Sequence, residues 1–369
     1  MNSINSTKKP EQKFHQIIRE DFRNINLKKD LRDEYKNLNA FYLDSEKRAS
    51  LESMTPFQKW IHKTGWLLKS MFLHLTPLRR ILVLVGVLFL LLSRSVSIND
   101  NSVTTNEGLF GGILILFVLF LELKDKLLAK YELEAGRKVQ RALMPEETPE
   151  IAGWNIWLFT RPANEVGGDL VDFLRLDENK VVLTMADIAG KGLQAALLTS
   201  KLQSTVRALA TEINSLPDLG KKINKIFHRD SLPNLFASML FMQIDSNSGK
   251  VNYINAGHFP PLIVKLKDIK ELHKGDIALG LVSNAEYNEQ TITLEQNEIL
   301  IAYSDGVFEA RSESGEFFGM ERFFQLLKNS SNNSPQQIGK YIITQLEQFI
   351  GDFTAADDIS LIIMKRNVC

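Results

Sequence analysis

The chain divides into four parts that differ in how apolar residues recur along the sequence. Residues 1–75 are rich in charge, and their apolar side chains recur every three or four positions, which predicts a charged, amphipathic helical N-terminal region. Two continuous apolar runs follow within residues 78–123. A charged segment with helical spacing, residues 124–145, then ends at Pro145, where a helix must stop or kink. From residue 146 to residue 369, short β-rich runs and grouped helical patterns predict a folded domain.

The two apolar runs predict a pair of transmembrane helices at about 78–98 and 107–123. The loop between them is polar and has no lysine, whereas Arg79 and Arg80 precede the first run and Lys124 follows the second. Positive charge marks the cytoplasmic side of a membrane segment. We therefore expect a multi-pass protein of the inner (cytoplasmic) membrane, with the N-terminus and the C-terminal domain both in the cytoplasm.

The C-terminal domain has runs of predicted strands separated by grouped helices. The predicted strands are Trp154–Arg161, Leu170–Leu176, Val181–Ala186, Ala237–Ile244, Lys250–Asn255, Leu262–Leu266, Gln290–Leu294, Glu298–Tyr303 and Ile359–Lys365; the predicted helices are Leu193–Thr211, Leu219–Ser231, Met320–Lys328 and Pro335–Ile350. A parallel, doubly wound sheet would need strict alternation of strands and helices. The observed order instead predicts an α+β fold in which antiparallel sheets are covered by helices.

Charge and cysteine content exclude several classes of function. The 44 lysine and arginine residues balance 44 aspartate and glutamate residues, so no global basic field indicates nucleic-acid binding. The single cysteine is the last residue, Cys369, which excludes internal disulfides and a cysteine cluster for zinc or iron–sulfur. This composition suits a reducing compartment.

Aspartates recur where the predicted strands stop. They are Asp169 after two glycines, Asp187 before the turn that holds Gly190 and Gly192, Asp305 before Gly306, and the pair Asp357 and Asp358 before the last strand. One aspartate at a strand end is usually a turn or cap residue. Several carboxylates together are the ligands that Mg²⁺ and Mn²⁺ prefer, and two such ions can polarise a shared water for phosphoryl transfer.

Seven motifs in order give a more specific indication. They are Val139–Pro145, Pro162–Asp169 with Asp172 and Phe173, Ala186–Gly192, Asn255–Pro261, Tyr303–Ala310, Phe318 with Gly319, and Asp357–Ser360. Together they resemble the PPM-type metal-dependent protein serine/threonine phosphatases, in the bacterial SpoIIE-like branch that acts on regulators of sigma factors. The resemblance covers residues 134–365 and implies an αββα sandwich of two antiparallel sheets flanked by helices.

The resemblance also implies a site and a chemistry. Asp169, Asp187 and Asp305 match metal ligands, with the backbone carbonyl of Ile188 beside them and Asp187 bridging two Mn²⁺ or Mg²⁺ ions. In the last pair Asp357 matches the family ligand better, and Asp358 is the alternative. The implied reaction is direct attack of a metal-activated water on phosphoserine or phosphothreonine of a partner protein, for which an anti-sigma-factor antagonist is the expected substrate.

Three further residues of these motifs are not assigned as metal ligands. His258 is interpreted as a structural residue of its tight turn, with a proton donor as the alternative. Glu165 is interpreted as a loop residue that shapes the site, with an indirect role at the metal as the alternative. Lys191 has two interpretations, a solvated turn lysine or a group that attracts phosphate. It does not form a phosphate loop for nucleotides, because Gly192 and Leu193 follow it in place of serine or threonine.

Two questions of organisation remain open at the level of sequence. The helical segment 124–145 is either a solvated connection or a dimerising rod, and we expect it to couple the N-terminal segments to the helices after Gly192. A catalytically silent scaffold with the same fold is the alternative to an enzyme. A silent relative would be expected to have lost part of the carboxylate set, and all four positions are filled.

Overall fold

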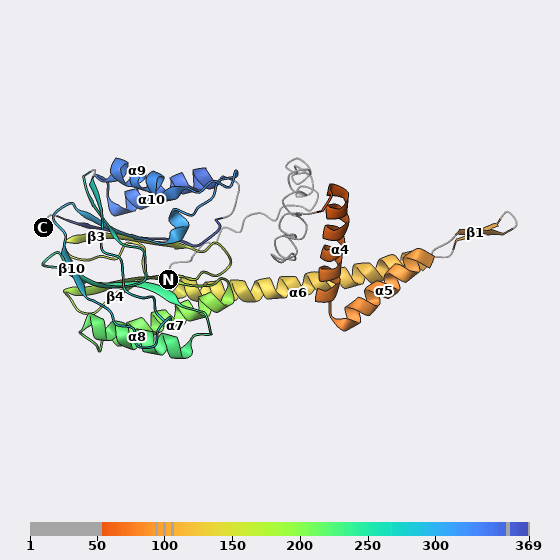
Figure 1. The fold of residues 1–369 in the computed structure, drawn as a ribbon, viewed down its shortest axis with the longest axis horizontal. Coiled ribbons are helices and arrows are strands. Elements are labelled where there is room, and N and C mark those ends of the chain that lie inside the picture. The colour runs from red at the N-terminus through yellow and green to blue at the C-terminus, as the bar shows by residue number, and fades with distance from the viewer. Residues whose placement is uncertain are drawn as a thin grey trace, which may run out of the picture. The chain divides into compact units, whose positions relative to one another are not determined.

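A computed structural model describes residues 54–92, 95–98, 101–104, 107–266, 268–351 and 355–367 (Figure 1). The chain separates into two compact units, Met1–Lys126 and Leu127–Cys369. Most of the predicted amphipathic N-terminal region, residues 1–53, lies outside the described residues.

The described part of the first unit consists mainly of helices. It contains α4 (Pro56–His74), α5 (Pro77–Leu92), the paired strands β1 (Ser95–Ile98) and β2 (Asn101–Thr104), and the first part of α6 (Glu107–Leu143). Two glycines bring α5 and α6 into close contact, because a Cβ on Gly111 would lie 2.5 Å from the carbonyl oxygen of Gly86. Arg79 then pairs with Glu122 and Asp125, each at 2.6 Å.

The predicted transmembrane hairpin at 78–98 and 107–123 is wrong. Among the described residues, no helix is both long enough and apolar enough to cross a membrane. Helix α5 has 16 residues, about 24 Å of helix against a hydrocarbon core of about 30 Å. Helix α6 has 37 residues, but any 18-residue stretch of it includes at least three charged side chains. The predicted location, a multi-pass protein of the inner membrane, is therefore not supported.

The second unit is a sandwich of two five-stranded antiparallel sheets. The first sheet has the order β10–β7–β6–β5–β4, and the second has the order β3–β12–β11–β8–β9. The strands are β3 (Trp154–Arg161), β4 (Asp169–Arg175), β5 (Lys180–Ile188), β6 (Ala237–Asp245), β7 (Lys250–Ala256), β8 (Leu262–Lys265), β9 (Asp268–Glu271), β10 (Gln290–Thr293), β11 (Ile299–Tyr303) and β12 (Ile359–Arg366).

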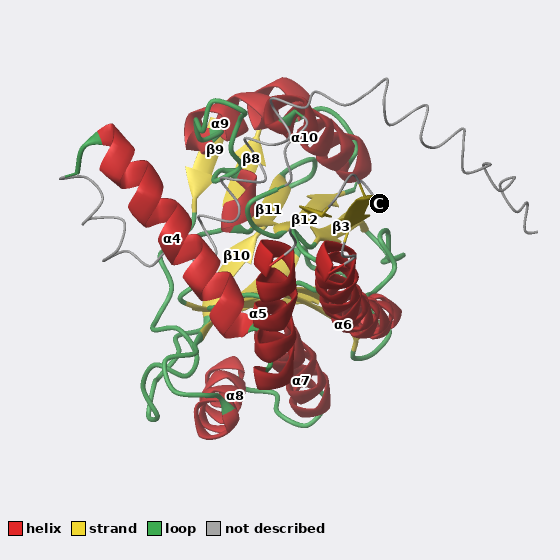
Figure 2. Ribbon diagram, turned by 90° about the vertical axis from the view of Figure 1, so that its right-hand side faces the viewer, coloured by secondary structure: helices red, strands yellow, loops and turns green. Residues whose placement is uncertain are grey.

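Two pairs of helices cover the outer faces of the sheets (Figure 2). Helices α7 (Leu193–Ala210) and α8 (Leu216–Asp230) pack on the first sheet, and α9 (Gly319–Ser330) and α10 (Pro335–Ile350) pack on the second. Each sheet is therefore buried on both faces, which explains why the central strands read as continuous apolar runs. In β5, for example, Val182 packs beneath the helices while Val181 and Leu183 face the other sheet.

The predicted α+β sandwich is confirmed, with helices and antiparallel sheets in the expected order. Strand β3 and helix α10 have the predicted bounds, and the other predicted elements differ by one to three residues at their ends. Within this second unit, two short elements were not predicted, β9 and the 3₁₀ helix η1 (Asp305–Val307). Strand β9 has the sequence Asp-Ile-Lys-Glu, which carries too little apolar pattern to predict a strand.

Candidate active site

The predicted aspartates gather at one end of the sandwich because of strand periodicity. Successive side chains of a strand point to opposite faces, so Asp187 continues the row of Leu183 and Met185 that faces the other sheet. Asp169 stands directly opposite Asp187 in the antiparallel pair β4–β5. We call this end of the sandwich, where β4 begins and β5 ends, the acidic end.

Asp169 is half-buried and lies against hydroxyl groups of the second sheet. Ser360 Oγ donates a hydrogen bond to Asp169 Oδ2 at 2.5 Å and lies 2.9 Å from Thr160 Oγ1. The backbone N–H of Ser360 in turn donates to Ser304 Oγ at 2.9 Å. These contacts join the start of β4 to β3, to β12 and to the residue that follows β11.

Asp305 and Asp357 come from the second sheet and lie near Asp187. Asp305 begins η1 directly after β11, and Asp357 precedes β12. Lys191 lies among these carboxylates, with its Nζ 2.8 Å from Asp357 Oδ2 and 2.9 Å from the carbonyl oxygen of Ala356. The interpretation of Lys191 as a solvated turn lysine is therefore incomplete, because this exposed side chain pairs with a predicted ligand.

Asp358 makes different contacts from its neighbour Asp357. Its carboxylate accepts hydrogen bonds from the backbone N–H groups of Ala163 at 2.7 Å, Gly168 at 2.6 Å and Asp169 at 3.2 Å. Its side chain is buried, whereas the side chain of Asp357 is 40% exposed. Asp358 thus holds the loop before β4 in place, which leaves Asp357 as the carboxylate directed to solvent and to Lys191.

Burial and mutual repulsion make Asp169, Asp187 and Asp305 hard to ionise. Burial, then the charges of Asp305 and Asp357, raises the pKa of Asp187 to about 7. The pKa of Asp169 lies well above its ordinary value because of burial and the neighbouring Asp187, and burial with Asp357 also raises the pKa of Asp305. The acidic end therefore carries negative charge that the surrounding residues compensate only in part.

This donor set fits a hard divalent cation in its chemistry. In the described part of the chain, no group of three or more acidic, histidine or cysteine side chains is arranged to hold a metal ion. The carboxylates are bonded instead to N–H groups, to a hydroxyl and to Lys191. The raised pKa values of Asp169 and Asp187 nonetheless indicate an excess of carboxylate in a half-buried place, which Mg²⁺ or Mn²⁺ would compensate.

Backbone geometry around Asp187 requires glycine. Gly190 and Gly192 have positive φ angles, +127° and +74°, in the turn between β5 and α7. At the other side, a Cβ on Gly306 would lie 2.0 Å from the carbonyl oxygen of Asp358. The predicted ligand Ile188 ends β5, and a Cβ on residue 168 would lie 3.4 Å from its carbonyl oxygen.

His258 and Glu165 lie on either side of the acidic end. His258 is buried, its Nδ1 lies 2.9 Å from Ser238 Oγ, and burial lowers the pKa of its ring to about 4. Its amide and carbonyl groups bond to the side chain of Asn255, as expected for a residue of a tight turn. Glu165 lies 3.6 Å from Arg137 and 3.8 Å from Lys130, both on the second half of α6.

The end of α6 contacts the loop that carries Asp169. Gln140 makes two hydrogen bonds with Gly167, accepting from its N–H at 3.2 Å and donating to its carbonyl oxygen at 3.0 Å. Thr199 of α7 donates to the carbonyl oxygen of Gly168 at 2.6 Å. Helices α6 and α7 therefore hold the same loop from two sides.

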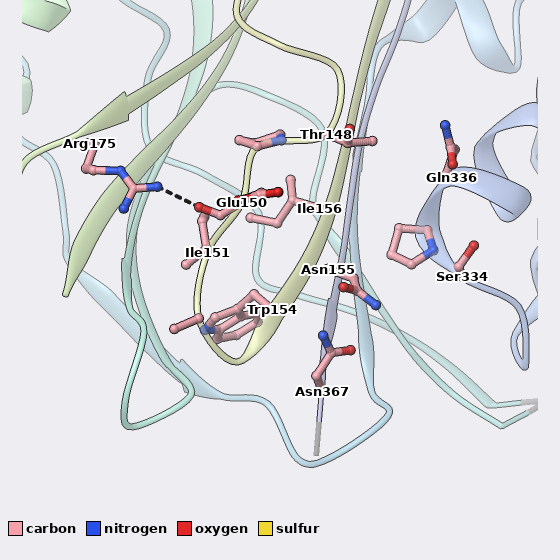
Figure 3. A pocket seen from close by; sticks show the side chains of 13 residues that line it. Thr148, Glu150, Ile151, Trp154, Asn155, Ile156, Arg175, Ser334, Gln336 and Asn367 are labelled. Atoms are coloured by element: carbon pink, nitrogen blue, oxygen red, sulfur yellow. Dashed lines mark hydrogen bonds between the residues drawn. The ribbon is translucent and has the colours of Figure 1, made fainter. Parts of the chain in front are cut away.

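An open hollow of about 780 Å³ lies at the opposite end of the sandwich (Figure 3). It is lined by residues where β3 begins and where β4 and β12 end, among them Trp154, Arg175 and Asn367. The acidic end lies where these same strands have their other termini. The candidate site is thus defined by charge and burial and not by the size of a cavity.

Several residues of the site were not predicted from the sequence. Ser304 and Ser360 were missed, although each continues the inward row of its strand, after Ala302 in β11 and before Ile362 in β12. Strand periodicity is the signal that could have found them. Gln140 lies within the motif Val139–Pro145, but its pairing with Gly167 has no local signal, since the tertiary fold alone brings the two residues together.

Comparison with known proteins gives the same family as the resemblance found in the sequence motifs. The SpoIIE family, described as Stage II sporulation protein E, matches residues 177–367, or 191 of the 369 residues. Protein IcfG from Synechocystis sp. is 28% identical over 310 residues, which cover 75% of this chain and 49% of that protein. Phosphoserine phosphatase RsbU from Bacillus subtilis is 27% identical over 248 residues, which cover 65% of this chain and 71% of that protein.

The fold also matches a solved structure. The SiaA-PP2C domain of Pseudomonas aeruginosa superposes with a TM-score of 0.57 at 18% identity, covering 66% of this chain and 99% of that domain. The sandwich therefore has the fold of a PP2C-type domain. The chain is a member of the SpoIIE family, which confirms the resemblance found in its motifs at the level of the family. The chain spans about half the length of IcfG.

Proposed function

We propose that this chain removes phosphate from phosphoserine or phosphothreonine on a partner signalling protein, for which an anti-sigma-factor antagonist is the expected substrate. The observation that carries the proposal is the half-buried cluster of Asp169, Asp187 and Asp305 at one end of the sandwich, whose raised pKa values mark a place suited to positive charge. The name of the similar phosphoserine phosphatase RsbU supports the choice of substrate.

Several residues of the acidic end would share the binding of two metal ions. Asp169, Asp187, Asp305 and Asp357, with the carbonyl of Ile188, would hold two divalent ions, Mn²⁺ or Mg²⁺. Such ions supply an activated water and stabilise the charge on the transferred phosphoryl group.

Hydrogen bonds made by the chain itself keep this donor set in position. Ser360 orients the carboxylate of Asp169, and Asp358 fixes the loop before β4 through three backbone amides. Asp358, the alternative ligand, is already occupied in this way, which supports Asp357 as the metal ligand.

Phosphate release from a phosphoserine peptide tests the function. With Mn²⁺ present, the wild-type protein is expected to release phosphate, and a chelator is expected to stop the reaction. Asp187→Asn keeps the shape of the side chain but removes its charge, so we expect release to fall by at least about 100-fold. Undiminished release by Asp187→Asn would contradict the metal assignment, and an equal loss in Asp177→Asn, at the opposite end, would point to misfolding.

The second half of α6 is proposed to couple the N-terminal segments to the site. Its last turn bonds to both the loop before β4 and α7: the carbonyl of Leu143 accepts from Gln203 at 3.0 Å and from Arg207 at 3.1 Å. A chain that starts near Lys138 removes the contacts of Arg137 and Lys130 with Glu165. Equal activity of this chain and the full-length protein would reject the coupling.

The same helix is proposed to form a homodimer. Leu128, Tyr131 and Val139 are each more than half exposed, and their spacing places them near one face of α6. Light scattering of the wild-type protein and of Tyr131→Glu tests this: the variant is expected to be monomeric. A monomeric wild-type protein would reject the dimer.

A further inference from the structure

One flank of the acidic end is an exposed apolar surface. Three loops meet there, residues 231–236 before β6, residues 257–261 after β7, and residues 277–282 before β10. Six large apolar side chains on these loops are 37–53% exposed: Leu232, Phe236, Phe259, Ile277, Leu281 and Val282. We call these six residues the apolar flank.

The loops of the apolar flank contact one another, so their exposed side chains belong to one surface. Ala237 and Leu279 exchange backbone hydrogen bonds of 3.0 and 2.8 Å, which join the first loop to the third. A Cβ on Gly257 would lie 2.8 Å from Cβ of Ala278, so the second loop also lies against the third. The surface is therefore continuous across the three loops.

The apolar flank reaches the candidate site from two directions. Phe259 packs edge-on against Phe308 at a centroid distance of 5.2 Å, and Phe308 lies three residues after Asp305. On the other side, a Cβ on Gly190 would lie 3.5 Å from the side chain of Leu235, within the first loop. A phosphate at the carboxylates would thus lie beside this surface.

Charge distinguishes this flank from the rest of the acidic end. Residues 231–243, 251–264 and 277–285 include no aspartate, glutamate, lysine or arginine. The opposite flank presents Arg137, Glu165 and Lys130. A contiguous apolar surface beside a charged site is typical of a protein–protein contact.

We infer that the apolar flank binds the apolar residues that adjoin the phosphoserine of the substrate protein. The inference rests on the proposed function and specifies its substrate: a protein whose phosphorylated residue is flanked by exposed leucine, isoleucine or phenylalanine. Each residue of an extended segment spans about 3.3 Å, so side chains two to four positions from the phosphoserine lie about 7–13 Å from it, and these are the positions we assign to the apolar flank.

Two matched phosphoserine peptides test the inference. One has leucine at positions two, three and four after the phosphoserine, and the other has serine at these positions, so that both have the same charge. We expect the wild-type protein with Mn²⁺ to show a kcat/KM about tenfold higher for the leucine peptide, mainly through KM, as expected from the burial of apolar side chains. Equal kcat/KM values for the two peptides would overturn the inference.

Variants test whether the preference for the leucine peptide depends on the apolar flank. Leu281→Ser is expected to reduce the ratio of kcat/KM values several-fold and to leave hydrolysis of p-nitrophenyl phosphate unchanged. Leu266→Ser, a control at the opposite end where the leucine is 72% exposed, is expected to keep the full ratio. A ratio that stays tenfold in both Leu281→Ser and Phe259→Ser would show that the apolar flank is not the binding surface.

Two further measurements separate peptide binding at the apolar flank from catalysis and from self-association. Fluorescence anisotropy of the two peptides reports binding without hydrolysis, so a protein that binds the leucine peptide more tightly but releases no phosphate would contradict the proposed function and support the apolar flank. Light scattering tests a second copy of the chain as the occupant. A dimer that becomes monomeric in Leu281→Ser would overturn the inference in favour of self-association.

Discussion

The two ends of the sandwich carry the same residue type in opposite environments. At the end that holds the hollow of Figure 3, Asp177 and Asp245 accept hydrogen bonds from the backbone amides of their own turns, at 2.8–3.2 Å. These amides lower the pKa of Asp245. At the acidic end, burial and neighbouring carboxylates raise the pKa values of Asp169 and Asp187.

The difference shows what turns an aspartate at a strand end into a candidate ligand. A turn aspartate is stabilised by donors from its own segment, so its charge stabilises the fold locally. The carboxylates of the acidic end come from strands of two different sheets, and they repel one another. Such an arrangement costs stability unless a cation binds, which is the physical basis for assigning function to one end and structure to the other.

Removing one carboxylate from each end of the sandwich should give the largest difference in Mn²⁺-dependent phosphate release between two variants. Asp305→Asn is expected to lower Mn²⁺-dependent phosphate release by at least about 100-fold and to weaken Mn²⁺ binding in calorimetric titration. Asp245→Asn is expected to keep both within about twofold of the wild-type values. If both variants retained activity, the acidic end would not be the site of reaction.

Within the acidic end, the pair Asp357 and Asp358 should separate ligand from scaffold. Asp358→Ala leaves three backbone N–H groups without their acceptor and is expected to lower the free energy of unfolding by about 3 kcal/mol. Asp357→Ala removes a partly exposed ion pair and should cost less than about 1 kcal/mol.

Chemical denaturation without divalent ions measures both effects, and Mn²⁺ titration separates the roles. Asp357→Ala is expected to weaken Mn²⁺ binding, while Asp358→Asn, which retains an acceptor oxygen, is expected to keep most of the stability. A larger loss of stability in Asp357→Ala than in Asp358→Ala would reverse the two roles.

The sequence predicted the strands, the covering helices and the aspartates because each has a local signal. Apolar period and glycine turns are enough to place Asp187 and Asp305 at strand ends. The distinction between Asp357 and Asp358 could not be made in this way, since both precede the same strand. It depends on the amides of Ala163 and Gly168, which are nearly 200 positions away in the sequence.

The prediction of transmembrane helices in the first unit was wrong because the sequence has only a weak signal for where a helix ends. Leucine-rich runs resemble membrane spans, and their composition alone did not show where each helix would end. Helix α5 ends at Leu92, and charged residues from Glu122 onward lie within α6. Span length is set by these boundaries, which are the part of a sequence prediction with the weakest local signal.

The pH dependence of stability should also differ between the two ends. In the metal-free protein the pKa of Asp187 is about 7, above its unfolded value of 3.8, so between about pH 4 and 7 the folded state binds more protons than the unfolded state. Stability should therefore fall by roughly 1 kcal/mol per pH unit as the pH rises through this window.

Urea denaturation between pH 5 and 8 measures this slope. Asp187→Asn is expected to flatten it, and saturating Mg²⁺ or Mn²⁺ is expected to offset the loss at high pH. Asp245 is ionised in both the folded and unfolded states over this range, so Asp245→Asn should leave the slope unchanged. A stability that rises with pH in the metal-free wild-type protein would contradict the repulsion inferred at the acidic end.

The smallest expected effect is on the stability contributed by a turn aspartate. Asp245→Ala removes the acceptor for the amides of Asn247 and Ser248, which are exposed and can bond to water, so the free energy of unfolding should fall by about 0.5–1 kcal/mol. The pKa of Asp245 is lowered in the folded state, so this stabilisation should be present near neutral pH and lost as the pH falls below about 4. Denaturation of Asp245→Ala and wild type at pH 7 and pH 3 checks both the size and the sign: a difference that grew at pH 3 would mean that charge at this end, as at the acidic end, opposes folding.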